Sequence, residues 1–339
     1  MSGAAALPTV LLWTPFPAQG EAVRAALAGM DGVRLLCAAT EAEAIALLPL
    51  ADAALFAGAG AGYTAELAQA VRLTPRLRWL QSLSTGIDGI EKHGLPAHVV
   101  LSGIGDAGAA VVAEHALALL LALARGLPHA MRQAEQGQWD RQIATRLRSL
   151  EDMRLGVLGC GGIGQATALR ARAFGMACTG VNRGGINPAP ELFDTVLPMA
   201  RLHEALAACD ALVVALPLTA QTRGVLDAAA WRACKSGVLV VNVGRGALID
   251  SDALLAALDA RQVGAAGLDV TDPEPLPADS PLWRRPDVLI TPHIAGGGSA
   301  AGLRRLAGVV AANVQRFMRG EPVQPQLRRA AQPTVGGAA

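Results

Sequence analysis

The hydrophobic residues of this chain fall in short apolar runs that alternate with segments of helical spacing. The first hundred residues contain five such runs: Val10–Trp13, Val33–Ala38, Ala53–Ala57, Leu77–Leu83 and Val99–Ile104. Between them, residues 20–30, 41–49 and 64–73 have the periodicity of amphipathic helices. Because strands that alternate with helices form βαβ units, this pattern predicts a parallel sheet.

A second series of the same kind begins at Arg154. Its predicted strands are Leu155–Gly159, Cys178–Asn182, Thr195–Pro198, Ala211–Leu216, Val238–Val243, Ala265–Val270 and Val288–Thr291. Helical segments near 163–175, 200–208, 226–234 and 251–261 separate the first six. Nearly continuous apolar strands joined by crossover helices are typical of a doubly wound sheet that is covered on both faces.

Two longer helical patterns, Ala109–Ala124 and Ala300–Met318, bracket the second series. We expect the later helix to return and pack on the first domain. The chain length of 339 residues also fits two domains. The fold class predicted is α/β, with two Rossmann-like doubly wound parallel-sheet domains around a cleft. A flavodoxin-like substrate domain would comprise 1–104 plus 296–325, a dinucleotide-binding domain would comprise 105–295, and 326–339 would be a disordered tail.

Composition and charge argue against several classes of binding partner and structural site. Hydrophobic residues make up 52% of the chain and the net charge is +1, which indicates sizeable cores and no footprint for nucleic acid. Five widely spaced cysteines without a CxxC motif argue against a disulfide framework and against a zinc site. The apolar run 109–124 is shorter than the roughly 20 residues of a membrane span, so we expect a buried helix and no membrane contact. With no basic region at the N-terminus to suggest a signal peptide, we expect a cytoplasmic protein.

A glycine-rich turn follows the first strand of the second series. The sequence LGVLGCGGIG places Gly159, Gly161 and Gly164 in a GxGxxG pattern between a strand and a helix. The first glycine allows a tight turn, the second lets the backbone approach a pyrophosphate, and the third permits close packing of helix on strand. The helix N-terminus would then present free N–H groups to the phosphates.

The next predicted strand ends at Asn182-Arg183, about 20 residues further along. An NAD enzyme usually has Asp or Glu at this place, where it binds the ribose 2′-hydroxyl. Asn182 removes the repulsion that a carboxylate would offer to a 2′-phosphate, and Arg183 supplies a cation. The pair favours NADP over NAD.

Three loops at the ends of later predicted strands contain a set of polar residues suited to reducing a 2-keto acid. Arg245 follows one strand, Glu274 lies in a Pro-Glu-Pro turn after another, and His293 follows the last. Arg245 could bind the substrate carboxylate and polarise the carbonyl, while His293 could protonate the developing alkoxide. Glu274 would orient the imidazole and stabilise its charged form. His93, His98, His115, His129 and His203 belong to no such set, and we interpret them as surface or packing residues.

Residues 153–297 closely resemble the D-isomer-specific 2-hydroxyacid dehydrogenase family. The matching segments are GVLGCGGIG, ALPLTAQTRGVL, VNVGRGALID, GAAGLDVTDPEPLP and LITPHIAGG. Outside that range, VVAEHALALLLALARG resembles the family's interdomain helix and LQSLSTGIDGI its substrate-carboxylate loop. The resemblance covers about 80–318, and the first 75 residues match in pattern alone.

The resemblance implies a role for each matching position. Arg245, Glu274 and His293 would be catalytic, and the backbone amides of Ser84, Thr85 and Gly86 would hold the substrate carboxylate together with Arg245 and His293. Asp269 would contact the nicotinamide amide. The implied cofactor-binding set is Gly159, Gly161, Gly162, Ile163, Gly164, Asn182, Arg183, Leu216, Pro217, Thr222, Val243, Asp269, His293 and Gly296.

The expected function is therefore reduction of a small 2-keto acid, of the glyoxylate or hydroxypyruvate kind, to the D-2-hydroxy acid. NADP is the preferred cofactor, NAD is the other possibility, and a homodimer is the expected assembly. One alternative is an enzyme like 3-phosphoglycerate dehydrogenase, although the chain stops soon after Met318, where such enzymes often have a regulatory domain. A formate dehydrogenase would have glutamine at the position of Glu274. A dinucleotide-sensing corepressor would not need Arg245, Glu274 and His293 together.

Overall fold

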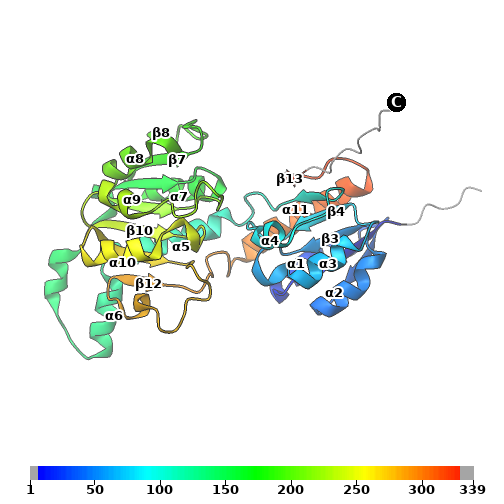
Figure 1. Cartoon of the computed structure of the whole chain (residues 1–339), viewed down its shortest axis with the longest axis horizontal. Helices are drawn as coiled ribbons and strands as arrows, with labels where there is room; N and C mark the ends of the chain where they lie inside the picture. Colours follow the sequence, from blue (N-terminus) through cyan, green and yellow to red (C-terminus); the bar gives the residue numbers. More distant parts are fainter. Residues whose placement is uncertain (1–6, 329–339) are drawn as a thin grey trace, which may run out of the picture. The chain divides into compact units, whose positions relative to one another are not determined.

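The computed structural model describes residues 7–328, which divide into two compact units (Figure 1). The first unit takes its described residues from 7–108 and 299–328, and the second unit is Ala109–Gly298. In each unit, helices cover both faces of a central sheet.

The first unit is built on a six-stranded sheet in the order β13-β5-β4-β3-β1-β2. Its strands are β1 (Thr9–Leu12), β2 (Arg34–Cys37), β3 (Ala53–Phe56), β4 (Trp79–Ser82), β5 (Val100–Ser102) and β13 (Gln326–Arg328). Its helices are α1 (Pro17–Leu27), α2 (Glu41–Leu47), α3 (Ala65–Arg72), α4 (Asp88–His93) and α11 (Ala300–Met318). Alternation along β1 sends Val10 and Leu12 to the face covered by α1 and α11, and Leu11 to the face covered by α2 and α3.

The second unit contains a seven-stranded sheet in the order β12-β11-β10-β9-β6-β7-β8, in which every pairing is parallel. Its strands are β6 (Arg154–Leu158), β7 (Ala177–Asn182), β8 (Thr195–Pro198), β9 (Ala211–Val214), β10 (Val238–Asn242), β11 (Val263–Leu268) and β12 (Val288–Ile290). Its helices are α5 (Ala109–Ala124), α6 (Leu127–Glu135), α7 (Gly162–Ala173), α8 (Leu202–Ala208), α9 (Ala228–Ala233) and α10 (Ser251–Asp259). Helices α5 and α7 cover one face, and α8, α9 and α10 cover the other.

The strand order of the second unit reverses beside β6. From β6 the chain proceeds to β7 and β8 on one side, then crosses back to β9 on the other. In open α/β sheets, ligands bind outside the carboxyl ends of the strands at such a switch point. The glycine-rich turn leaves β6 at this edge.

The predicted strands and helices are all present, and their ends agree within about three residues. The prediction missed the short helices α4 and α6 and the strand β13. The prediction that the chain is disordered from residue 326 onward was wrong for residues 326–328, which pair antiparallel with β5. The remainder of the expected tail, 329–339, lies outside the described residues.

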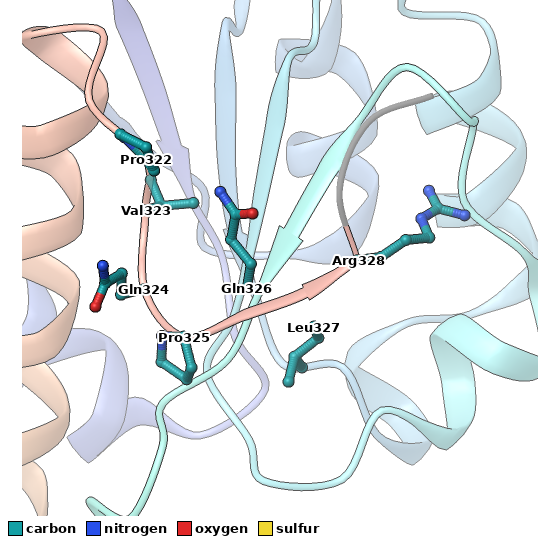
Figure 2. A pocket seen from close by; sticks show the side chains of 7 residues that line it. All are labelled: Pro322, Val323, Gln324, Pro325, Gln326, Leu327 and Arg328. Carbon is teal, nitrogen blue, oxygen red and sulfur yellow. The ribbon is translucent and has the colours of Figure 1, made fainter. Parts of the chain in front are cut away.

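The strand β13 is stabilised by its last side chain. The Arg328 guanidinium donates hydrogen bonds to the carbonyl oxygens of Leu95 (2.9 Å), Pro96 (2.6 Å) and Val99 (3.3 Å). Figure 2 shows this guanidinium pointing away from the side chains of residues 322–327, which line a pocket together with Arg328. None of these seven residues belongs to the site predicted from the sequence. This edge strand has only three residues and is held by one cation. It is therefore too short to show the alternating hydrophobic pattern by which strands are predicted from a sequence.

Within residues 7–328, no single helix is both long and apolar enough to cross a membrane. Helices α5 and α6 reach that length and composition only when taken as a pair, and the pair is bent by 66°.

A buried polar network joins α11 to the first sheet. Asn313, fully buried, donates to Gln81 Oε1 (2.8 Å) and to the Gln324 carbonyl (2.6 Å), and accepts from the Gln324 amide (2.8 Å). Gln81 Oε1 also accepts from Ser102, whose oxygen accepts from the Trp79 indole. Because buried polar groups are costly when unpaired, this network specifies where α11 and the chain after it must lie.

Replacing Asn313 with Leu should lower the free energy of unfolding by about 2–4 kcal/mol, because both backbone groups of Gln324 lose their partner. Urea unfolding followed by circular dichroism measures the change. Gln315→Leu, at an exposed position on the same helix, is the matched control and should stay within about 0.5 kcal/mol of wild type. Equal stability of the two variants would contradict this account of α11.

Candidate active site

Three loops of the second unit bring Arg245, Glu274 and His293 to one edge of its sheet. They follow β10, β11 and β12, which are neighbours in the sheet and run parallel. Since parallel strands end at the same edge, three residues far apart in sequence share one region. The structure therefore places the predicted catalytic residues at a common edge.

The imidazole of His293 and the carboxylate of Glu274 form the closest polar contact at this edge. His293 Nδ1 lies 2.6 Å from Glu274 Oε1, and the side chains are 45% and 41% exposed. A carboxylate accepts hydrogen bonds, so Nδ1 carries the proton of this bond. The second ring nitrogen, Nε2, has no partner within the described part of the chain. It can therefore exchange a proton with a ligand.

His293 itself has an unusual backbone conformation. Its φ is +53°, in the left-handed region that L-residues other than glycine rarely adopt. Its N–H donates to the Asp269 carbonyl at 2.8 Å, which helps to hold that conformation. Residues held in this region cluster at functional sites, where surrounding contacts offset the strain.

The Asp269 carboxylate lies buried under the His293 loop. Oδ1 accepts from the Thr291 hydroxyl (2.7 Å) and the Ile294 amide (3.0 Å), while Oδ2 accepts from the Ala295 amide (3.0 Å). Asp269 is only 2% exposed. In this structure, its carboxylate anchors the loop on both sides of His293.

His115, which the sequence predicted to be a packing or surface residue, contacts the same loop. The His115 Nε2 atom lies 2.9 Å from Thr291 Oγ1 and 3.3 Å from Asp269 Oδ1. The contact joins α5 to a loop 176 residues further along the chain. No local pattern could have signalled it.

Two neighbours shape the loop that presents Arg245. Asn242, fully buried at the end of β10, donates to the Arg245 carbonyl (2.9 Å) and accepts from the Gly244 amide (3.0 Å). A Cβ added to Gly246 would come within 2.0 Å of the Thr271 carbonyl. Glycine is therefore required where this loop packs against the segment that leads to Glu274.

The glycine-rich turn has the geometry expected of a dinucleotide site. Gly159 has φ +107°, and a Cβ there would lie 2.6 Å from the Ala215 carbonyl oxygen. A Cβ on Gly164 would lie 1.9 Å from the Gly159 oxygen, whereas one on Gly161 would meet nothing within 4 Å. No side chain caps α7 at its N-terminus, so the first amides of the helix, at Gly162 and Ile163, have no side-chain acceptor there. The turn fits a pyrophosphate.

The end of β7 bears no carboxylate, as the sequence indicated. Asn182 accepts from the amides of Gly184 (3.2 Å) and Gly185 (2.7 Å) and donates to the Ile186 carbonyl (2.7 Å), so its side chain organises the following turn. Arg183 is exposed and makes no hydrogen bond or ion pair with any residue in the range 7–328. Its guanidinium is available to an anionic ligand.

The remaining predicted cofactor residues lie in loops at the same edge. Thr222 donates from Oγ1 to the Pro217 carbonyl (2.7 Å) and accepts from the Thr219 amide (2.8 Å), so its hydroxyl shapes the loop after β9. Leu216 and Val243 are each 7% exposed, and Gly296 has open space around its Cβ position.

The predicted substrate loop, 84–86, belongs to the first unit. The Ser84 hydroxyl donates to the Gly86 carbonyl (2.7 Å) and accepts from the Gly58 amide (2.9 Å). The Ser84 amide donates to Ser82 Oγ at 3.2 Å, so it is already engaged. The amides of Thr85 and Gly86 make no hydrogen bond within 7–328. Two of the three predicted amides therefore remain open.

Two cysteines of the second unit, Cys160 in the glycine-rich turn and Cys178 in β7, are buried. Burial raises the pKa of Cys160 to about 11, and it raises the pKa of Cys178 to the same range. A thiol with so high a pKa carries little thiolate near neutral pH. These residues act as packing groups.

Comparison with known proteins is consistent with this geometry. Residues 117–295 match the family model described as the NAD-binding domain of D-isomer-specific 2-hydroxyacid dehydrogenases. A D-3-phosphoglycerate dehydrogenase from Mycobacterium bovis is 34% identical over 304 residues, which cover 88% of this chain and 55% of that protein. The chain thus spans about half the length of the first curated relatives it matches.

Two solved structures have the same fold over nearly their whole length. A D-isomer-specific 2-hydroxyacid dehydrogenase family protein from Aeromonas salmonicida is 30% identical with a TM-score of 0.81, covering 95% of this chain and 99% of that one. An NADPH-dependent glyoxylate/hydroxypyruvate reductase from Sinorhizobium meliloti, solved with NADP and sulfate, is 27% identical with a TM-score of 0.79, covering 94% and 98%. This chain belongs to the D-isomer-specific 2-hydroxyacid dehydrogenase family.

Proposed function

We propose that this protein reduces a small 2-keto acid, of the glyoxylate or hydroxypyruvate kind, to the D-2-hydroxy acid, with NADPH preferred over NADH. In this proposal, residues 105–295 form the dinucleotide-binding domain, and 1–104 with 296–325 form the substrate domain. The observation that carries the proposal is the 2.6 Å contact between His293 Nδ1 and Glu274 Oε1, which leaves Nε2 open to a ligand.

The bound cofactor supplies the hydride for the keto carbon. His293 gives the proton on Nε2 to the carbonyl oxygen, so that this oxygen becomes the hydroxyl group of the product and the imidazole becomes neutral. Glu274 fixes the ring orientation and stabilises the charged imidazole before the transfer. Arg245 binds the substrate carboxylate and polarises the carbonyl.

The preference for NADPH rests on the end of β7. The Asn182 side chain is neutral and turned into its own loop, so nothing there repels a 2′-phosphate. Arg183 has an exposed guanidinium with no acceptor among the described residues. A planar guanidinium suits a phosphate well because it can donate two parallel hydrogen bonds.

A second candidate activity is oxidation of 3-phospho-D-glycerate. It is favoured by the 34% identity to a D-3-phosphoglycerate dehydrogenase. The two activities use the same residues, and they differ in whether the site must accept a phosphate on the substrate. Direct comparison of substrates decides between them.

We also propose a homodimer in the cytoplasm. Helix α6, which lies at the outside of its unit in Figure 1, has no buried residue. The helix and the segment after it expose Leu127 (49%), Met131 (65%) and Trp139 (92%). Exposed large apolar side chains favour a protein–protein contact. A second copy of the chain is the partner we propose, and the five free cysteines favour a reducing compartment.

A substrate panel tests the proposed activity. We expect wild type to reduce glyoxylate or hydroxypyruvate more efficiently than pyruvate or phenylpyruvate, and to oxidise 3-phospho-D-glycerate poorly. His293→Ala should lower kcat/KM for reduction by about 10²–10⁴-fold because the proton donor is gone. The wild-type rate should fall as the pH is raised, because the donor must be protonated.

His203→Ala is the matched control for this panel, since His203 is exposed on α8 of the same unit, and it should keep wild-type rates. Wild-type rates in His293→Ala would remove the assignment of the proton donor. Efficient oxidation of 3-phospho-D-glycerate would replace the first activity by the second.

Cofactor choice is tested at Arg183. Wild type should use NADPH at least about tenfold more efficiently than NADH, because one phosphate–arginine pair contributes roughly 1.5–3 kcal/mol. Arg183→Ala should remove most of that preference and leave the efficiency with NADH nearly unchanged. Arg232→Ala, at an exposed arginine on α9, is the control. Equal efficiency of wild type with both cofactors would refute the preference.

Light scattering after gel filtration tests the assembly. We expect a mass about twice the 34.7 kDa of one chain. Met131→Lys combined with Trp139→Lys should shift the protein to a monomer, because the charges oppose burial of this surface. Leu73→Lys, at an exposed position of the first unit, should leave the dimer intact. A monomeric wild type would contradict the proposal.

A further inference from the structure

A chain of hydrogen bonds leads from α5 to the loop that contains His293. It begins at His115 Nε2, passes through the Thr291 hydroxyl at 2.9 Å, and ends at Asp269 Oδ1, 2.7 Å further on. The His115 side chain is 20% exposed and that of Asp269 is 1% exposed. This series of hydrogen bonds is therefore mostly shielded from solvent.

Counting hydrogens fixes the direction of this chain. A carboxylate has no hydrogen to donate, so the single hydroxyl hydrogen of Thr291 must point at Asp269. The Thr291 oxygen can then only accept from His115, which requires a hydrogen on His115 Nε2. The 3.3 Å separation of that nitrogen from Asp269 Oδ1 adds a second, longer attraction to the same carboxylate. Both the neutral Nε2–H form and the charged form of His115 satisfy this arrangement.

The carboxylate at the end of the chain holds the backbone on both sides of His293. Asp269 binds the Thr291 side chain before it and the amides of Ile294 and Ala295 after it. The left-handed backbone of His293, at φ +53°, lies between these anchors. Such a conformation persists only where surrounding contacts determine it. The orientation of the imidazole toward Glu274 therefore depends on the carboxylate being in place.

We propose that His115 is a positioning residue for the proton donor, acting through Thr291 and Asp269. This inference rests on the proposed role of His293 and deepens it. Helix α5 packs along the sheet and is buried on one side, so it offers a rigid base for the donor atom. Without the Nε2–H group, the Thr291 oxygen loses the donor that ties it to α5, and the loop loses one of the restraints that keep the imidazole in place.

Side-chain shape suggests a set of variants at His115 and Thr291. His115→Leu removes the donor and keeps the bulk, whereas His115→Gln places an amide N–H near the position of Nε2. Thr291→Val removes the bridging hydroxyl from an otherwise isosteric side chain. His203→Leu, on α8 of the same unit, is the matched control for loss of a histidine.

Kinetics of keto-acid reduction give the first readout. We expect kcat to fall about tenfold in His115→Leu and in Thr291→Val, with little change in KM, because the donor is misaligned while substrate binding is kept. His115→Gln should recover to within about threefold of wild type. The double variant should lose no more than either single variant, since both remove the same chain. Losses that multiply, or a failure of His115→Gln to recover, would overturn the proposal.

Nuclear magnetic resonance of ¹⁵N-histidine-labelled protein without added substrate gives a readout that does not need activity. We expect a hydrogen on His115 Nε2, and we expect the ring signals of His293 to shift or broaden in His115→Leu and Thr291→Val but not in His203→Leu. A hydrogen found only on Nδ1 of His115, or an unchanged His293 signal in both variants, would overturn the inference. If wild type reduces no substrate of the panel, the proposed function fails. The magnetic resonance measurement still tests whether His115 positions His293 through Thr291. If His115→Leu does not fold, His115→Gln and Thr291→Val carry the test.

Discussion

The parallel direction of every strand in the second unit is the constraint on which its site depends. Strands β10, β11 and β12 are neighbours that all end at the same edge, so the loops after them meet there. This shared edge brings together three residues that are far apart in the sequence, Arg245, Glu274 and His293. The same edge receives the glycine-rich turn after β6, because the strand order reverses beside that strand.

Parallel strands bring the loops near one another, but buried side chains determine their shape. Asn242 bonds the Arg245 loop at two points, and Asp269 bonds the His293 loop at three. Gly246 allows the first loop to pack directly on the chain that leads to Glu274. A half-exposed imidazole and carboxylate can then hold a 2.6 Å contact, because the flexible side chains start from fixed backbone positions.

The sequence predicted the strands and helices of the alternating βα pattern, and it predicted the candidate site residues that directly follow those strands. Apolar runs and helical spacing gave every strand of the second sheet, and the glycine pattern gave the turn after β6 with its open face at Gly161. It could not predict β13, because that strand depends on Arg328 meeting carbonyls more than 200 residues away. For the same reason it gave no sign of the contacts of His115, whose polar partners are distant in sequence. Ser84 illustrates a third limit, since local hydroxyl contacts engaged an amide that the motif had suggested was free.

The position of Asp269 bears on two roles of its carboxylate, which are to anchor the His293 loop and to accept a hydrogen bond from a ligand. The family resemblance implied contact with the nicotinamide amide, yet the carboxylate is 2% exposed and accepts three hydrogen bonds from the loop that contains His293, with His115 nearby. A carboxylate has about four acceptor positions, so Oδ2 retains room for one further donor. The two tasks are therefore compatible, and a single buried anion can hold the His293 loop while it offers an acceptor to a ligand. Such sharing would couple the placement of a ligand at Oδ2 to the orientation of the imidazole, because any shift of the carboxylate moves both.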